Sequence, residues 1–267
     1  MNNAETKTIV ITGASAGIGA AMARRLGLDG HNLVLAARRA PELDAVARDS
    51  RTHAITVVAD VTRRADVVRL RDEALRAFPA VDVWINNAGR GITRSVMELT
   101  DADLDDMMAV NVKSALYGMQ AIVPMFIERG RGHIINISSF LGRVPIATHG
   151  SAYNAAKAAL NALTANLRVD LQQKHPGIHV SLVMPGLVST DFARNVTGST
   201  SATPPPWVAG GGPSPAMKPQ TADEVAAVVA DLIEHPRAEV YTNPASASLA
   251  QRYLEDVGAF EVALVSS

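Results

Sequence analysis

Short apolar runs rich in β-branched residues recur along the chain, and longer alanine- and leucine-rich stretches separate them. Runs that are apolar throughout are typical of strands whose two faces are both covered by helices. The pattern predicts strands at 8–12, 32–36, 54–59, 81–86, 133–138 and 179–184, with 238–242 as a seventh. It predicts helices at 17–28, 42–49, 63–77, 101–129, 152–174 and 221–234. Because strands and helices alternate, we expect an α/β fold with a doubly wound parallel sheet of about seven strands and helices on both faces.

One stretch, residues 191–218, departs from this alternation. Its central part, TGSTSATPPPWVAGGGPSPAM, contains five prolines and four glycines, which exclude a regular element over most of its length. Long irregular loops in compact domains are commonly lids or binding loops. We therefore expect one domain over 1–267 with a mobile substrate loop at about 191–218. Phe192, Trp207 and Met217 in this loop favour an apolar substrate pocket.

Composition narrows the class of protein. The 267 residues are 48% hydrophobic, carry a net charge of −1 and include no cysteine. A chain of this kind can bury a large core, and it has no basic excess that would indicate a nucleic-acid or anionic membrane partner. Neither a signal peptide nor an apolar run long enough to span a bilayer is predicted, so we expect a cytoplasmic protein. No metal site is predicted, because the sequence has no HExxH motif or Cys/His cluster.

A glycine-rich turn, TGASAGIG at 12–19, follows the first predicted strand and opens the first predicted helix. A glycine directly after the strand permits a tight turn, and later glycines let the backbone approach a pyrophosphate and let the helix pack on the sheet. The alternative is a turn with a purely structural role. The position between strand and helix favours a dinucleotide site formed by Gly13, Ser15, Ala16, Gly17, Ile18 and Gly19.

The end of the second predicted strand bears on the choice of cofactor. NAD-binding units carry an acid here, which accepts a hydrogen bond from the adenosine ribose. This chain has Ala36 and Ala37 at that point, followed by Arg38 and Arg39. A guanidinium group pairs well with a 2′-phosphate, so we predict NADP(H) rather than NAD(H).

Tyr153 and Lys157 lie four residues apart in the alanine-rich segment SAYNAAKAAL. Residues with this spacing share one face of a helix, so the phenol and the ammonium group can point into the same cleft. A tyrosine pKa is ordinarily about 10, and a nearby positive charge lowers it. The pair therefore predicts a tyrosine proton donor whose acidity is increased by the lysine. The alternative is a simple packing contact between the two side chains.

Taken together, TGASAGIG (12–19), NNAG (86–89), NISS (136–139), YNAAK (153–157) and PG (185–186) resemble the short-chain dehydrogenase/reductase family. The resemblance runs from about Thr6 to Glu234 and implies a Rossmann-like fold. It implies that Ser139, Tyr153 and Lys157 are catalytic and that Asn111 holds a water molecule against the lysine. It also implies cofactor contacts from Asp60, Val61, Asn87, Ala88, Gly89, Tyr153, Lys157, Pro185, Gly186, Val188 and Thr190.

One feature departs from the family pattern. Ser139 lies 14 residues before Tyr153, one more than is common in the family. Alignment on Gly142 favours Ser139 as the catalytic serine and places the extra residue in the following loop. Ser138 remains an alternative.

The resemblance implies an NADP(H)-dependent oxidoreductase that interconverts a ketone or aldehyde and an alcohol, with Tyr153 as the acid/base. Two alternatives are a non-catalytic dinucleotide-binding sensor and a β-ketoacyl-type reductase of the same family. The expected partner is a small carbonyl or alcohol substrate. Because helices equivalent to 101–129 and 152–174 often pair across a two-fold axis in this family, a homodimer or homotetramer is also expected.

Overall fold

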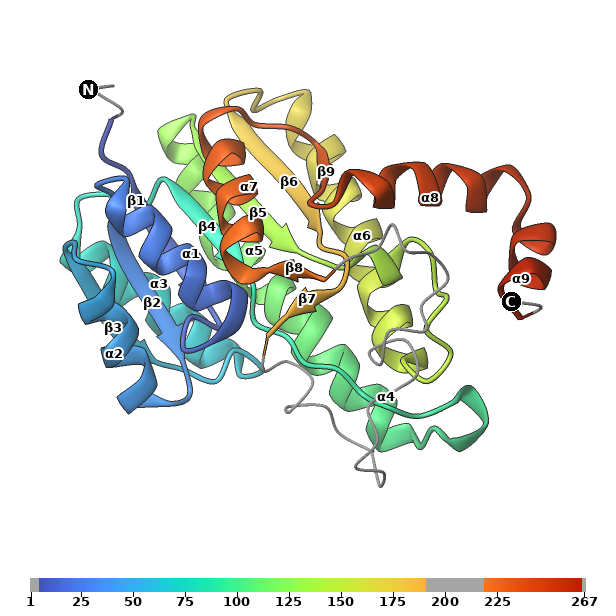
Figure 1. The fold of residues 1–267 in the computed structure, drawn as a ribbon. Helices are drawn as coiled ribbons and strands as arrows, with labels where there is room; N and C mark the ends of the chain where they lie inside the picture. The colour runs from blue at the N-terminus through green and yellow to red at the C-terminus, as the bar shows by residue number, and fades with distance from the viewer. Residues whose placement is uncertain (1–4, 191–218, 266–267) are drawn as a thin grey trace.

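The computed structural model describes residues 5–190 and 219–265, and its main sheet has seven parallel strands in the order β3-β2-β1-β4-β5-β6-β9 (Figure 1). The strands are β1 (Thr8–Thr12), β2 (Asn32–Ala37), β3 (Ala54–Val58), β4 (Val83–Asn86), β5 (Gly132–Ile137), β6 (Ile178–Met184) and β9 (Glu239–Tyr241). The predicted α/β fold with a doubly wound parallel sheet is confirmed. All seven predicted strands are present, with ends within two residues of those expected.

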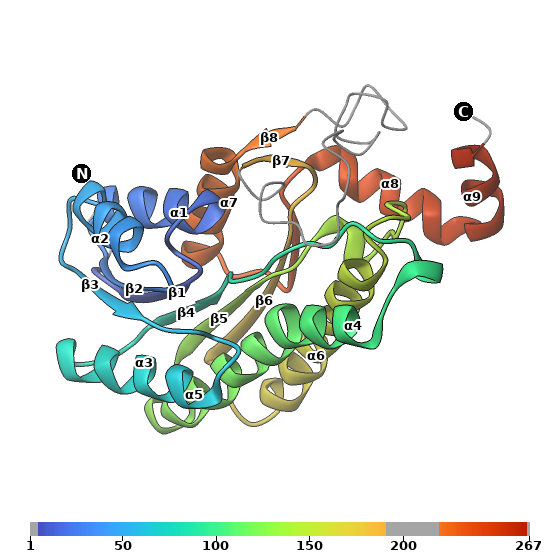
Figure 2. The ribbon, with the colours of Figure 1, turned by 90° about the horizontal axis from the view of Figure 1, so that it is seen from below.

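Helices cover both faces of the sheet (Figure 2). They are α1 (Gly17–Leu28), α2 (Ala40–Asp49), α3 (Arg64–Ala77), α4 (Asp101–Met108), α5 (Ser114–Arg129), α6 (Ser151–Gln172) and α7 (Ala222–Glu234). Side chains alternate in direction along a strand. Ile9 and Ile11 of β1 therefore enter the core formed with α1, α2 and α7, whereas Val10 packs into the core formed with α3 and α5. Burial on both faces explains why the strands are apolar throughout.

The strand order reverses between β1 and β4, which are neighbours in the sheet but are separated by β2 and β3 in the chain. In open parallel sheets, ligands bind outside the carboxyl ends of the strands at such a reversal. The loops that follow β1, β4 and β5 all leave the sheet at this edge. The fold therefore brings the glycine turn, the NNAG segment and the serine segment together.

The prediction of one continuous helix at 101–129 is wrong, because the helix is interrupted in its middle. Helix α4 ends at Met108, residues Ala109–Lys113 form a π-helical turn, and α5 begins at Ser114. The wide turn carries the buried Asn111, whose side-chain amide donates to the carbonyl oxygen of Arg90 at 3.0 Å and to that of Met107 at 3.2 Å. Such turns are frequent at functional sites.

Among the described residues, two strands and two α-helices were not predicted. Two short strands, β7 (Val188–Ser189) and β8 (Gln220–Thr221), pair in parallel, and two helices, α8 (Pro244–Glu255) and α9 (Val257–Val265), end the chain. Among the described residues, none of the helices combines the length and the apolar character needed to cross a membrane. The predicted substrate loop at 191–218, with Phe192, Trp207 and Met217, lies outside the described residues. The assignment of 1–267 to one domain stays a prediction.

Candidate active site

The glycine turn after β1 has the backbone shape that only glycine adopts easily. Gly13 and Gly17 have φ values of +68° and +53°, in the left-handed region. A Cβ atom on Gly13 would lie 2.8 Å from the Cα atom of Ala88, and one on Gly19 would overlap the carbonyl oxygen of Gly13. The turn therefore packs against the NNAG segment and against itself, with no room for larger residues.

Thr12 joins this turn to the loop after β4. Its hydroxyl accepts hydrogen bonds from the backbone amides of Asn87 at 3.0 Å and Ala88 at 3.2 Å, and donates to the carbonyl oxygen of Ile85 at 3.3 Å. The side-chain amide of Asn87 donates to the Thr12 carbonyl oxygen at 2.9 Å. Thr12 was not predicted as a site residue, although its position directly before Gly13 could have indicated this role.

The start of α1 fits the diphosphate of a dinucleotide. Its N-cap residue, Ala16, provides no side-chain hydrogen bond, and its first turn contains no acidic residue. The amides of a helix N-terminus have no partner within the helix and favour negative charge. Ser15, Ala16, Gly17 and Ile18 are each partly exposed here. Four of the predicted dinucleotide-binding residues thus lie partly exposed at the amino end of α1.

Two arginines follow β2, and the structure distinguishes them. The guanidinium group of Arg39 donates to the Ser15 hydroxyl at 3.1 Å and pairs with Glu42 at 3.3 Å. Arg38 is exposed and makes no hydrogen bond or ion pair with any described residue. Arg39 therefore lies directly over the glycine turn. The exposed guanidinium group of Arg38, the preceding residue, remains available to bind a ligand there.

Asp60 and Val61 follow β3 at the same edge of the sheet. The Asp60 carboxylate accepts hydrogen bonds from the amide of Thr62 at 3.0 Å and from its hydroxyl at 2.7 Å. Val61 is buried in the core between the sheet and α3. These contacts give both predicted cofactor-contact residues defined positions in the loop.

Tyr153 and Lys157 lie on the first turns of α6 and face the end of β5. The ammonium nitrogen of Lys157 is 5.7 Å from the centre of the Tyr153 ring and donates to the Ile137 carbonyl oxygen at 2.9 Å. The Ser139 hydroxyl is hydrogen-bonded to Tyr153. It also accepts a hydrogen bond from the amide of Leu141 at 3.1 Å. Serine, tyrosine and lysine therefore converge, as the sequence predicts.

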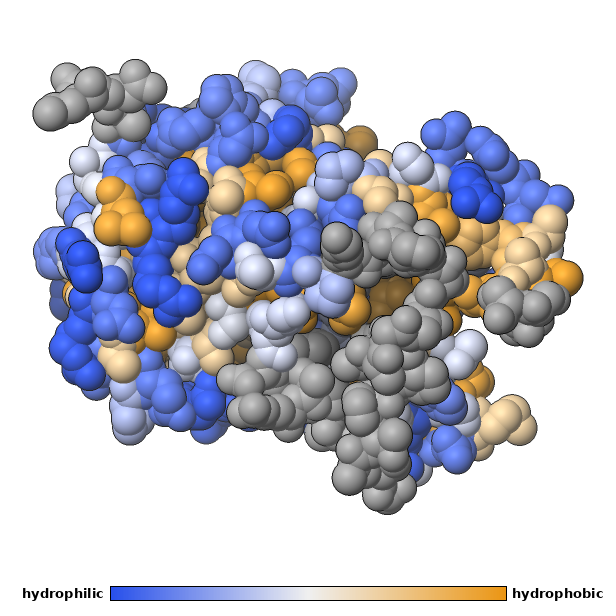
Figure 3. Space-filling view, viewed as in Figure 1, coloured by the Kyte–Doolittle hydropathy of each residue, from blue (hydrophilic) through white to orange (hydrophobic). Residues whose placement is uncertain are grey.

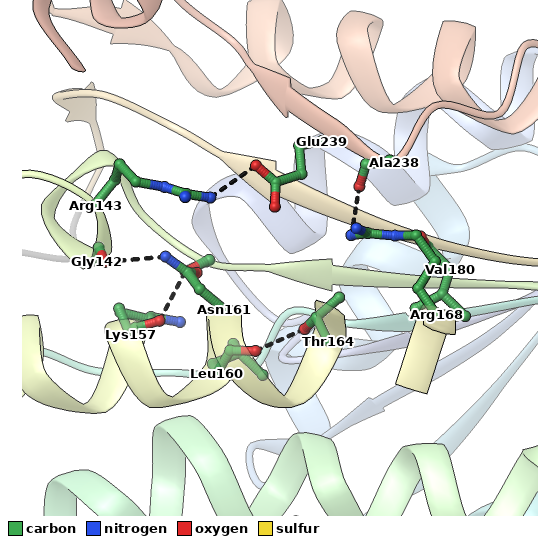
Figure 4. A network of polar contacts seen from close by, with 11 residues as sticks. Gly142, Arg143, Lys157, Leu160, Asn161, Thr164, Arg168, Val180, Ala238 and Glu239 are labelled. Atoms are coloured by element: carbon green, nitrogen blue, oxygen red, sulfur yellow. Dashed lines mark hydrogen bonds and ion pairs between the residues drawn. The ribbon is translucent and has the colours of Figure 1, made fainter. Parts of the chain in front are cut away.

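Ser138, the alternative serine, points elsewhere. Its hydroxyl is buried and donates to the side-chain oxygen of Asn161 on α6 at 2.5 Å. Asn161 in turn donates to the carbonyl oxygen of Gly142 at 3.0 Å, so it holds the loop that follows Ser139 against α6 (Figure 4). This geometry favours Ser139 over Ser138 and identifies Asn161 as a positioning residue that sequence reasoning missed.

Asn111 and Lys157 meet across Gly89. A Cβ atom on Gly89 would lie 2.7 Å from the side-chain oxygen of Asn111 and 3.5 Å from the Lys157 nitrogen. The side chain of Asn111 is already engaged with the backbone of Arg90, from whose amide it accepts at 3.3 Å. The structure therefore places Asn111 beside the lysine, with its side chain bonded to the loop after β4, and its role in holding a water molecule stays a prediction.

Burial moves the pKa values of the two ionisable groups in opposite directions. It raises the pKa of Tyr153 to about 12, although the hydrogen bond from Ser139 acts in the lowering direction. It lowers the pKa of Lys157 to about 8. The net shift of the Tyr153 pKa is therefore upward, opposite to the predicted lowering, because loss of hydration is its largest cause.

The segment after β6 bridges the two halves of the site. The carbonyl oxygen of Pro185 accepts a hydrogen bond from the amide of Phe140, next to Ser139, at 2.8 Å. Gly186 and Val188 follow, and Thr190 lies 3.6 Å from the place of a Cβ atom on Gly17. The predicted cofactor-contact residues of this segment thus run from the serine loop to the glycine turn.

A buried polar chain beneath the site was also missed. The side-chain amide of Asn86 donates to Asn136 at 2.8 Å, and that of Asn136 donates to the Thr164 hydroxyl of α6 at 2.9 Å. Trp84 donates to the oxygen of Asn86 at 2.8 Å. Polar residues at the ends of otherwise apolar strands were the available signal. In the parts of the chain that the structure describes, no group of His, Asp and Glu residues could hold a metal ion.

Comparison with known proteins gives the chain its family. A model of the short chain dehydrogenase family matches residues 7–200. An uncharacterised oxidoreductase of Staphylococcus epidermidis is 34% identical over 194 residues, which are 73% of this chain and 83% of that protein.

Solved structures agree in fold. A short-chain dehydrogenase/reductase from Burkholderia phymatum, in complex with NAD, has a TM-score of 0.85 and 28% identity, covering 97% of this chain and 96% of that one. An alcohol dehydrogenase from the archaeon Thermococcus sibiricus, complexed with 5-hydroxy-NADP, has a TM-score of 0.73 and 27% identity, covering 89% and 96%. The chain belongs to the short-chain dehydrogenase/reductase family of oxidoreductases.

Proposed function

We propose that this protein is an NADP(H)-dependent oxidoreductase that interconverts a ketone or aldehyde with the corresponding alcohol. The observation that carries the proposal is the convergence of Ser139, Tyr153 and Lys157 at the end of β5. The Ser139–Tyr153 hydrogen bond and the lysine 5.7 Å from the tyrosine ring join a proton donor to a positive charge. This arrangement lies at the same sheet edge as the glycine turn.

Each residue has a role in this proposal. The hydroxyl groups of Ser139 and Tyr153 hydrogen-bond to the substrate oxygen and orient the carbonyl group. A bound nicotinamide cofactor supplies or accepts the hydride at the carbonyl carbon. Tyr153 gives its proton to the substrate oxygen during reduction and takes it back during oxidation.

Lys157 stabilises the phenolate that forms when Tyr153 gives up its proton, since the opposite charge is close and shielded from water. Tyr153 carries its proton at neutral pH, as donation in reduction requires, and because its raised pKa of about 12 makes the phenol a weaker acid, stabilisation of the phenolate by Lys157 matters more. Asn111 supports the lysine side of the site, and a water molecule held there would resupply the proton. Lys157 also holds the ribose of the cofactor in this proposal.

The preference for NADP(H) rests on the end of β2. Arg39 lies over Ser15 of the glycine turn, and Arg38 is exposed beside it. No acid stands at Ala36 or Ala37 to accept a ribose hydroxyl. Two positively charged groups at this point favour a 2′-phosphate. The related alcohol dehydrogenase from Thermococcus sibiricus was solved with an NADP derivative, whereas the Burkholderia phymatum protein was solved with NAD.

A panel of ketones, aldehydes and secondary alcohols, assayed with NADPH, NADH and their oxidised forms, tests the proposal through the absorbance of the reduced nicotinamide. We expect turnover with medium-sized apolar carbonyl compounds and a higher kcat/KM with NADPH than with NADH. Cofactor binding without turnover of any compound would favour a sensor. Turnover confined to acyl thioesters would favour a β-ketoacyl-type reductase.

A further inference from the structure

Helix α9, the last described helix, is apolar around most of its surface. Helix α9 reads VGAFEVALV, and its one charged residue is Glu261. It is a well-defined helix, because the Asp256 carboxylate accepts a hydrogen bond from the amide of Ala259 at 2.9 Å and so caps its first turn. A helix of this composition is ordinarily buried in protein.

In this structure α9 stands at the edge of the molecule. Figures 1 and 2 both show α8 running out from the end of β9 and α9 lying beyond it. The ring of Phe260 packs edge-on against Tyr253 of α8, with 5.5 Å between ring centres. Leu254, Val257 and Val262 are nevertheless 63%, 40% and 65% exposed. Figure 3 shows apolar residues gathered at this end of the molecule.

A pocket of about 590 Å³ adjoins this helix. It is lined by Ser95, Val96, Leu141, Gly142, Arg143, Pro145, Thr148, Ser151, Asn154, Ala155, Ala158 and Tyr253. Met97, next to Val96 in the chain, is 93% exposed. Tyr253 both lines the pocket and contacts Phe260, so the apolar helix and the apolar hollow of one chain lie side by side.

The pocket is separate from the candidate active site. On a helix, successive residues are turned by about 100°. Ala155 and Ala158 of α6 therefore face well away from Tyr153 and Lys157, and both are exposed. These two residues and the catalytic groups thus lie on different sides of α6, although Leu141, whose amide donates to the Ser139 hydroxyl, lines the pocket as well.

The helix and the pocket also carry side chains of opposite charge. Arg143 is the charged residue among those lining the pocket, and Glu261 is the charged residue of α9. Arg143 pairs with Glu239 at 2.7 Å (Figure 4), and its Nε atom is buried with no hydrogen-bond partner among the described residues. The Arg143 side chain is still 31% exposed, so its guanidinium group can meet a second carboxylate at the surface as well as Glu239.

We propose that α9 of one copy of the chain packs into this pocket of a second copy, and that the second copy does the same in return. Because helix and pocket adjoin on one chain, a two-fold axis at this end brings each helix onto the other chain's pocket. The nine-residue helix is about 14 Å long and about 10 Å across, giving a side surface of about 400 Å². Because Phe260 packs against Tyr253 of the same chain, about half of that surface, about 200 Å², is open to a partner. One helix face and one receiving surface on each of two copies bury about 800 Å² in all, the size of a small, weakly associating interface.

An anionic membrane fits this surface less well. Glu255, Asp256 and Glu261 are exposed around α9, against one exposed arginine, Arg252. Helices that bind anionic lipid surfaces carry an excess of lysine and arginine. The acidic surroundings of α9 suit the arginine in the pocket of a second copy.

The first test is sedimentation velocity of the full chain over a range of concentrations. We expect a dimer or a multiple of it, and we expect Val262→Glu to weaken that association at least tenfold. Leu28→Glu is the matched control, since Leu28 on α1 is 68% exposed and far from α9 in the fold. Val169→Glu, at a 70% exposed site on α6, probes the helix pairing common in the family.

The second test is cross-linking, which is clean because the chain has no cysteine of its own. Val262→Cys and Ala158→Cys proteins are mixed and oxidised, and Val262→Cys with Leu28→Cys is the control mixture. We expect a mixed disulfide dimer in the first mixture and little in the second. Restored association when Glu261→Arg is combined with Arg143→Glu would further support the contact.

Several results would overturn the proposal. One is a monomer at all concentrations. Another is an assembly that Val262→Glu leaves intact and Val169→Glu breaks. A third is a monomer that floats with phosphatidylcholine vesicles through α9.

Discussion

The two halves of the site are specified by different kinds of residue. The half around β1 and β4 depends on backbone shape: positive φ values at Gly13 and Gly17, and the absence of a side chain at Gly19. The half around β5 and α6 depends on buried polar side chains, whose positions and charges follow from hydrogen bonds and loss of hydration. Steric changes should therefore damage the first half, and changes of protonation or hydroxyl groups should damage the second.

The largest expected effect is in the catalytic half. Tyr153→Phe removes the proton donor while keeping the ring, so we expect kcat to fall about 10³-fold, within the range for loss of a general acid. NADPH affinity, measured by fluorescence titration, should change little. Tyr117→Phe is the matched control, since Tyr117 lies on α5 against Arg64. Activity of Tyr153→Phe within tenfold of the wild type would contradict the assigned role.

The next largest effect is expected in the half of the site around β1 and β4, which depends on backbone shape. An added methyl group in Gly19→Ala would overlap the Gly13 carbonyl oxygen and approach the Asn87 amide at 2.7 Å. We expect the free energy of unfolding to drop by about 2 kcal/mol, as in other overpacked sites. NADPH binding should weaken at least tenfold, measured by calorimetry at a temperature where the variant is folded.

Gly30→Ala is the control variant, because it introduces backbone strain away from the cofactor site. Gly30 has φ of +85° and no atom near the place of a Cβ, so its replacement should cost stability through strain alone. NADPH affinity should be unchanged in this variant. If both variants lose affinity equally, the turn has no special role in binding.

A smaller effect is expected from a substitution that alters the preference for NADPH over NADH. Ala37→Asp places an acid at the end of β2, where it can accept a ribose hydroxyl and repel a 2′-phosphate. We expect the ratio of kcat/KM for NADPH to that for NADH to fall at least tenfold, because a hydrogen bond to a charged group contributes about 1.5–3 kcal/mol. Ala37→Asn, of similar size but uncharged, should shift the ratio less. An unchanged ratio in Ala37→Asp would remove the basis for the NADP(H) proposal.

Much of the fold could be predicted because helices cover the sheet on both faces. Strands such as β1 and β5 must then be apolar throughout, and that pattern is visible in the sequence. The interruption of 101–129 was not visible, since a π-helical turn depends on how Asn111 bonds to the loop after β4. Helix α8 had a usable signal: Asn243 caps it, with Pro244 at its first position.

The candidate site was predictable in composition but not in electrostatics. Residue types and spacing indicated which side chains meet, and the structure brings Ser139, Tyr153 and Lys157 together. The choice between Ser138 and Ser139 needed the direction of each hydroxyl, which depends on Asn161 in another segment. The pKa of Tyr153 needed its burial, which no local pattern reveals. Whether the carried-over cofactor residues act as the family implies stays a prediction.

The central claim is that a buried, positively charged Lys157 lets the protonated Tyr153 beside it act as the acid in carbonyl reduction. Because burial disfavours the ammonium form, Lys157 should lose its proton near pH 8 rather than near 10.5, while Tyr153 stays protonated to about pH 12. The direct test is the pH profile of kcat/KM for reduction, compared with that of Lys157→Arg, which keeps its charge. We predict a level profile below about pH 7 and a tenfold fall per pH unit above about 8, absent in Lys157→Arg. A wild-type profile that stays level to about pH 10 would contradict the account.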